Sequence, residues 1–114
     1  TNQAGVARGI FKEAFVAEAH RHIADRLALG GARVDGFYYC PHHPEHGAVR
    51  DCECRKPEPG MLLEATREHD VDLTHSFMIG DKISDVEAAI RRNPSQAALI
   101  AAGVGFVFGL ILSR

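Results

Sequence analysis

The chain has 114 residues, of which 46% are hydrophobic and 25% are charged. Its 13 Lys and Arg against 15 Asp and Glu give a formal net charge of −2. This length predicts one domain and excludes a large multidomain enzyme, and the slightly acidic balance does not indicate a partner among the nucleic acids.

The first predicted element is an amphipathic helix between residues 10 and 29. Apolar residues recur there at four-residue spacing, and charged residues occupy the other faces. The apolar positions are Phe11, Phe15, Ala19, Ile23 and Leu27. Gly30 and Gly31 end the helix. Residues 34–39 are short and rich in aromatic and β-branched side chains, which predicts a strand that leads into a Cys/His-rich segment at 40–54.

Two further helices and one buried strand are predicted after that segment. The first of these helices runs from Met61 to about His69, after Pro57 and Pro59 have kept the backbone extended. Residues 76–79 predict a buried strand, and residues 84–92 predict a third helix. Strands that alternate with helices indicate an α/β fold with a parallel sheet, whose ligands gather at the carboxyl ends of the strands.

The Cys/His-rich segment predicts a zinc site. It contains a C-x-H pair, nine intervening residues and a C-x-C pair, and so offers Cys40, His42, Cys52 and Cys54 as four ligands within fifteen positions. Zinc takes four such ligands in a tetrahedron, and a site filled by protein ligands is structural because no position is left for water. His43 and His46 are alternatives to His42 as the fourth ligand. Three clustered cysteines favour a metal site in a reducing compartment, by default the cytoplasm, over a disulfide framework.

Three polar segments predict a phosphate and magnesium site around the zinc loop. Arg55 and Lys56 directly follow the last cysteine, so a pinned loop would hold two cations at a fixed place. Asp81 and Lys82 follow the predicted strand at 76–79, where a carboxylate binds Mg²⁺ and a lysine meets phosphate. Residues 1–5 offer a hydroxyl, amides and backbone N–H groups as a phosphate cradle of the nest type.

The motifs resemble one known family. The chain is similar to the D-glycero-D-manno-heptose 1,7-bisphosphate 7-phosphatases, within the haloacid dehalogenase superfamily, and the resemblance extends to about residue 92. It rests on TNQAGVAR at 1–8, FYYCPHHP at 37–44, CECRKPEPGM at 52–61 and FMIGDKISD at 77–85. The resemblance implies a Rossmann-like fold, a structural zinc, and Mg²⁺-dependent hydrolysis of a phosphomonoester through an aspartyl-phosphate.

The resemblance also implies roles for individual residues. Thr1 would hydrogen-bond the transferring phosphoryl group, and Lys56 would neutralise its charge. Asp81 would bind Mg²⁺, and the four ligands of the Cys/His-rich segment, three cysteines and His42, would bind zinc. Substrate contacts would come from Asn2, Gln3, Ala4, Arg55 and Lys82. The substrate partner would be a phosphorylated sugar.

One required motif is absent from the 114 residues. The family takes its nucleophile and general acid from an Asp-x-Asp-Gly-Thr motif at the end of a first strand, which would lie before Thr1. The only Asp-x-Asp here, Asp70 to Asp72, follows a polar stretch rather than a buried strand, and so does not fit that role. A covalent step needs a nucleophile however well charge is neutralised. We therefore expect an N-terminally truncated domain that is inactive as written.

The end of the chain departs from the family. Residues 1–92 are predicted to form the partial phosphatase domain. Residues 93–114 are predicted to form an apolar helical tail that resembles the anchor of a small inner-membrane protein. Gly105 and Gly109 form a small-xxx-small pair, and arginines flank the segment. The apolar run from Ala97 to Leu112 is short for a membrane span. The alternative is that this segment folds back as a core helix or strand.

Three functions follow from these observations. The first is a heptose-bisphosphate phosphatase domain, of which this chain is an incomplete piece. A histidinol-phosphate phosphatase is the nearest enzymatic alternative, because it resembles the same fold and zinc loop. A non-catalytic zinc-stabilised module, tethered to a membrane through the tail, is the alternative from another class. The run Tyr38 to His43 and the AGVARG sequence at 4–9 favour the heptose enzyme.

Overall fold

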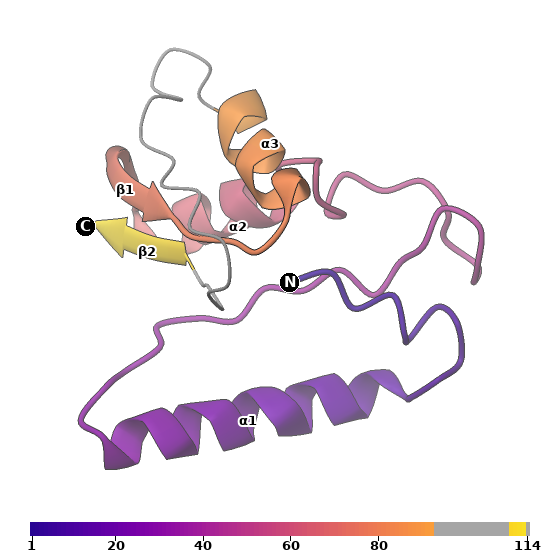
Figure 1. Cartoon of the computed structure of the whole chain (residues 1–114), viewed down its shortest axis with the longest axis horizontal. Helices are drawn as coiled ribbons and strands as arrows, with labels where there is room; N and C mark the ends of the chain where they lie inside the picture. Colours follow the sequence, from indigo (N-terminus) through magenta and orange to yellow (C-terminus); the bar gives the residue numbers. More distant parts are fainter. Residues whose placement is uncertain (93–109, 114) are drawn as a thin grey trace. The chain divides into compact units, whose positions relative to one another are not determined.

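The computed structural model describes residues 1–92 and 110–113 (Figure 1). The described elements are α1 (Glu13–Leu29), α2 (Gly60–His69), β1 (Asp72–Met78), α3 (Ile83–Arg92) and β2 (Leu110–Ser113). The chain divides into two compact units, Thr1–Cys52 and Glu53–Arg114. The first unit contains α1 and the cysteine-rich loop as far as Cys52, and the second contains the other four elements.

Helix α1 confirms the first predicted helix, with a later start. The expected start at residue 10 belongs to a series of tight turns over residues 4–10, in which the Arg8 N–H donates to the Ala4 carbonyl at 3.0 Å and the Ile10 N–H donates to the Gly5 carbonyl at 2.8 Å. Glu13 in the first turn and Arg26 in the last turn complement the helix dipole. The helix ends at Gly30, and Gly31 then takes a positive φ of 77°, a conformation that glycine adopts without strain.

The apolar stripe predicted for α1 is not its buried face. Phe15, Ile23 and Leu27 remain 55%, 44% and 40% exposed, whereas Val16 is buried. One turn further along the same face, the ring of His20 stacks on Phe37 with ring centroids 4.5 Å apart. The segment that contains Phe37 therefore covers the face of α1 on which Val16 and His20 lie. Four-residue apolar spacing alone does not identify this face.

Residues 34–39 do not form the predicted strand. The segment is extended, and it meets the amino-terminal residues in one isolated parallel bridge between Asn2 and Cys40. Around that bridge, the Cys40 N–H donates to the Thr1 carbonyl at 2.9 Å and the Gln3 N–H donates to the Cys40 carbonyl at 2.7 Å. A strand needs a partner along its whole length, and within the described residues these bonds reach only the end of the segment.

The second unit forms a small layer of two helices and two strands (Figure 1). Helices α2 and α3 confirm the predicted helices, each beginning one residue earlier than expected. Helix α2 ends at His69 and is capped by Asp70, which takes a left-handed φ of 50°, a conformation that Asp tolerates better than most residues. Among the residues of this unit whose burial the structure describes, the buried apolar side chains are Met61, Ala65, Val71 and Ala88.

The described sheet is antiparallel, which corrects the predicted parallel sheet. Strand β1 pairs with β2, with Phe77 opposite Ile111 and Met78 opposite Leu110. The pairing shifts register before it reaches Asp72 opposite Ser113. Strand β1 begins four residues earlier than expected and is only half-buried, with Phe77 53% exposed. A strand buried on both faces needs covering layers on each side, whereas a strand of an antiparallel sheet can leave one face exposed.

The apolar helix predicted for the tail is wrong at its described end. Leu110–Ser113 is a strand, as in the alternative in which the segment folds back onto the α/β domain. The remainder of the predicted tail helix, residues 93–109 and 114, lies outside the described residues. Among the helices that the structure describes, none combines the length and the apolar character that a membrane span needs.

Candidate metal centre and phosphate-binding residues

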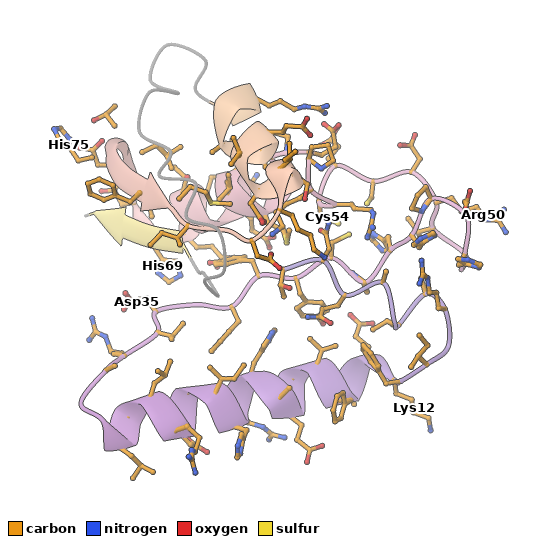
Figure 2. All side chains as sticks on the ribbon, in the orientation of Figure 1. Lys12, Asp35, Arg50, Cys54, His69 and His75 are labelled. Carbon is orange, nitrogen blue, oxygen red and sulfur yellow. The ribbon has the colours of Figure 1, made fainter. Side chains whose placement is uncertain are left out.

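The four predicted zinc ligands lie together. The Sγ atom of Cys40 lies 3.6 Å from the Sγ atom of Cys52 and 3.8 Å from Nδ1 of His42. The ligand atom of Cys54 completes a group whose members all lie within 4.8 Å of one another. Cys54 is joined to Cys52 through a single residue, so the chain itself keeps it near the other three. Figure 2 shows Cys54 on the loop that precedes α2.

These distances and donor types fit zinc. Zn–S bonds of about 2.3 Å and Zn–N bonds of about 2.0–2.1 Å in a tetrahedron separate two sulfurs by about 3.8 Å, and a sulfur from a nitrogen by about 3.6 Å. The observed separations of 3.6 and 3.8 Å differ from these edges by about 0.2 Å. The cysteines are free thiols, and 3.6 Å is far beyond the S–S bond length of about 2.05 Å.

The structure distinguishes the three histidines of the loop. His42 lies with the thiols, whereas the two alternatives to it, His43 and His46, do not belong to that group. His43 is buried, and its Nε2 lies 3.0 Å from Nη2 of Arg8, while its Nδ1 lies 3.1 Å from the Glu45 backbone nitrogen. His46 lies beside His43, with ring centroids 4.8 Å apart.

Cys40 connects the predicted zinc site to the predicted phosphate cradle. The backbone bonds described above hold Thr1 and Gln3 against Cys40, whose side chain is fully buried. The amino group of Thr1 also donates to the Tyr38 carbonyl at 2.7 Å, and the Gln3 side-chain amide donates to the Thr1 hydroxyl at 3.3 Å. Thr1 is exposed, and residues 2–4 are half-buried. A metal at Cys40 would therefore stabilise the same backbone that presents the Thr1 hydroxyl.

In the second unit, Lys56 is held by Asp85. The Lys56 ammonium forms an ion pair with the Asp85 carboxylate, and the side chains are 19% and 4% exposed. The Lys82 backbone N–H donates to the same carboxylate at 3.1 Å. Asp85 can lie this close to the loop because residue 80 is glycine: a Cβ at residue 80 would lie 2.3 Å from the Asp85 Cβ. Arg55 is half-buried, whereas Asp81 and Lys82 are exposed.

Asp85 lies behind Asp81 and Lys82 in the segment predicted to bind phosphate and magnesium, but its pairing with Lys56 is not predicted from the sequence. Its position in the first turn of α3, three residues after Lys82, is a signal that was present in the sequence. A carboxylate there can accept from backbone N–H groups at the start of the helix and also reach a neighbouring cation. The ion-pair partner of Lys56 is thus set by packing between the loop and α3.

A second glycine fixes the loop that carries the cysteines to α2. The Gly60 N–H donates to the Glu53 carbonyl at 2.8 Å. A Cβ at residue 60 would lie 2.3 Å from that carbonyl oxygen and 3.0 Å from the Cα of Cys54. Since these neighbours are backbone atoms, the close approach requires glycine.

The Asp-x-Asp sequence at 70–72 leads from the end of α2 into β1, and Asp72 bonds to neighbouring residues of that strand. The Asp72 carboxylate accepts hydrogen bonds from the Thr74 hydroxyl at 2.6 Å and the Thr74 N–H at 2.9 Å, and it contacts His75 Nδ1 at 2.7 Å. The Thr74 hydroxyl first, and His75 second, lower the pKa of Asp72 to about 2. His75 projects outward near the beginning of β1 (Figure 2). The Asp72 side chain is 45% exposed.

Comparison with known proteins supports the resemblance seen in the motifs. A family model described as HAD-hydrolase-like matches residues 53–105. A D-glycero-beta-D-manno-heptose-1,7-bisphosphate 7-phosphatase from Photorhabdus laumondii is 47% identical over 106 residues, which cover 90% of this chain and 56% of the relative. The enzyme of that name from Rhodopseudomonas palustris is 53% identical over 92 residues, covering 78% of this chain and 51% of the relative.

Two solved structures share the fold. The D,D-heptose 1,7-bisphosphate phosphatase from B. bronchiseptica, complexed with magnesium and phosphate, is 40% identical with a TM-score of 0.65 over 80% of this chain and 49% of that chain. A putative HAD-like phosphatase from Mesorhizobium loti is 36% identical with a TM-score of 0.75, over 80% of this chain and 45% of that chain. The chain thus spans about half the length of the relatives that it matches.

Proposed function

We propose that this chain, a relative of the D,D-heptose 1,7-bisphosphate phosphatases of the haloacid dehalogenase superfamily, forms the zinc-loop portion of such an enzyme. The reaction is hydrolysis of the 7-phosphate of D-glycero-D-manno-heptose 1,7-bisphosphate. The observation that carries the proposal is the Lys56–Asp85 ion pair at the end of the cysteine loop, together with curated relatives that are 47% and 53% identical.

Lys56 stabilises the charge of the transferring phosphoryl group. A preorganised cation aimed at developing charge is among the largest contributions that an enzyme makes to a rate. The ion pair with buried Asp85 restricts the flexible lysine stem to one orientation, and the Lys82 N–H holds the carboxylate in turn. Lys56 therefore meets the phosphoryl group from a fixed point.

The remaining predicted residues complete the proposal. Thr1 donates its hydroxyl to a phosphoryl oxygen, and Asp81 is the Mg²⁺ ligand; when bound, Mg²⁺ supplies Lewis-acid stabilisation of the phosphoryl charge. Zinc at the cysteine cluster is structural. Contacts to the sugar phosphate come from Asn2, Gln3, Ala4, Arg55 and Lys82. The attacking aspartate comes from a segment outside these 114 residues, which contain no Asp-x-Asp-Gly-Thr sequence.

The setting of the reaction follows from the substrate and from the thiols. A phosphorylated sugar is a small soluble metabolite, and three reduced cysteines persist in a reducing compartment. We therefore assign the chain to the cytoplasm, with a phosphorylated sugar and no nucleic acid as its partner.

The test extends the chain at its amino end with a segment that carries the Asp-x-Asp-Gly-Thr motif. Release of inorganic phosphate from the heptose bisphosphate is expected from the extended protein and not from the 114 residues alone. K56A in the extended protein is expected to lower kcat by about a hundredfold or more. The control is K12A, because Lys12 lies at the start of α1 and has no role in the site (Figure 2). Equal turnover in the two variants would overturn the role given to Lys56.

A further inference from the structure

We propose that His43, Glu45 and His46 form a second metal site, which uses none of the four residues of the cysteine cluster. One ligand atom from each of the three residues lies within 4.8 Å of the other two. The three residues offer two imidazole nitrogens and a carboxylate oxygen, a donor set that suits a borderline divalent cation. All three belong to one loop of the unit Thr1–Cys52.

The burial of the three side chains favours an open site at the surface. His43 is 8% exposed, so its ring is held in place before any ion arrives. Glu45 and His46 are exposed and can reach an ion from the solvent side. Three protein ligands leave at least one coordination position for water or another small ligand. The site therefore differs in kind from the cysteine cluster, where four protein ligands surround the ion.

In the structure, the cation that contacts the His43 ring is the guanidinium of Arg8. A guanidinium always donates, so its Nη2 atom at 3.0 Å needs the lone pair of Nε2. A metal ion at Nε2 needs the same lone pair, and hence binds only when Arg8 leaves. Arg8 is exposed and its side chain has several rotatable bonds, so it can turn into solvent. With its lone pair on Nε2, a neutral His43 ring carries its proton on Nδ1, which lies 3.1 Å from the Glu45 backbone nitrogen. Two N–H groups do not bond to each other, so metal binding at Nε2 requires the Glu45 backbone nitrogen, in an exposed bend, to move away from the ring as the Glu45 carboxylate turns to the ion.

This competition predicts opposite effects from two charged neighbours. Glu45 supplies a ligand and a negative charge, so its removal weakens metal binding. Arg8 places a positive charge near a dication and occupies a ligand atom, so its removal strengthens metal binding. A histidine-rich loop that collects metal ions without a defined site would not show this pair of opposite signs.

The experiment uses the 114-residue chain with one equivalent of Zn²⁺ added first to occupy the thiolates. Ni²⁺ is then titrated by calorimetry, and thiolate-to-nickel charge-transfer absorption is recorded to reveal any nickel bound to cysteine. We expect one additional equivalent to bind without that absorption. E45Q and H46N are expected to weaken the binding by at least about tenfold, since even the loss of a residue that only hydrogen-bonds to a metal ligand lowers metal affinity about 10–100-fold. R8Q is expected to strengthen it by about threefold, from a unit charge near a dication in screened solvent.

The matched control is H22N, because His22 is an exposed histidine on α1 outside the cluster. It is expected to bind nickel as the unchanged chain does. E45Q changes an exposed side chain, so a folding defect is not a source of its effect. The proposal is overturned if no nickel binds beyond the thiolates, if E45Q and H22N bind equally well, or if R8Q weakens the binding.

Discussion

Replacing Asp85 by Asn is expected to destabilise the unit that contains α2 and α3 by about 2 kcal/mol. Removing one partner from a fully buried ion pair costs about 3–5 kcal/mol, whereas a surface pair contributes about 0–1 kcal/mol. The Asp85 side chain is 4% exposed and that of Lys56 is 19% exposed, which places the pair between these limits. Asn retains an oxygen that accepts from the Lys82 N–H, so only the ionic part is lost.

The reciprocal change supplies the coupling energy. K56M leaves the buried Asp85 carboxylate without its ammonium, and the expected cost is about 3 kcal/mol, because an uncompensated buried charge is the more expensive remainder. If the two side chains stabilise the fold through their ion pair, the double variant loses less free energy of unfolding than the sum of the losses of the two single variants. We expect the difference to be about 1.5–2 kcal/mol.

The assay is urea denaturation followed by far-UV circular dichroism, with E58Q as the control. Glu58 forms an ion pair with Arg91 in the same unit, but those side chains are 45% and 48% exposed. Because solvent screens that pair, E58Q is expected to cost less than about 1 kcal/mol. If D85N costs no more than E58Q, or if the double variant shows no coupling, then burial does not strengthen the Lys56 pair and the reasoning fails.

Two further predictions concern the loop glycine and the aromatic cluster. G60A is expected to lower the free energy of unfolding by about 1–2 kcal/mol, since its Cβ would overlap the backbone of Glu53. The control G30A is expected to be nearly neutral, because its Cβ would meet only the Leu27 carbonyl at 3.6 Å. Equal melting temperatures of the two variants would contradict this prediction. Burial first, and the amino-terminal charge second, lower the pKa of His20 from 6.5, so its contribution to stability is present above pH 6.5 and is lost as the pH falls through the lowered value. H20F should remove that part of the pH dependence of thermal unfolding, and an unchanged profile would count against it.

The sequence located the helices and the Cys/His cluster because both depend on short distances along the chain. Amphipathic spacing located α1, α2 and α3 to within about three residues at their starts, and the pair Gly30 and Gly31 located the end of α1. The Cys-x-His pair and the Cys-x-Cys pair lie close in the chain, so closing one loop is enough to bring them together. The family motifs are also local, and the comparisons support the resemblance that they carry.

Tertiary structure decided which groups meet across longer separations. Lys56 pairs with Asp85, 29 residues away, because α3 packs against the loop. His42 rather than His43 lies with the thiols, because the ring of His43 is turned toward Arg8, 35 residues away. The direction of β2 against β1 and the buried face of α1 likewise depend on which segments cover them. Local patterns encode propensity and spacing, whereas pairing and burial are properties of the partners, which lie far apart in the chain.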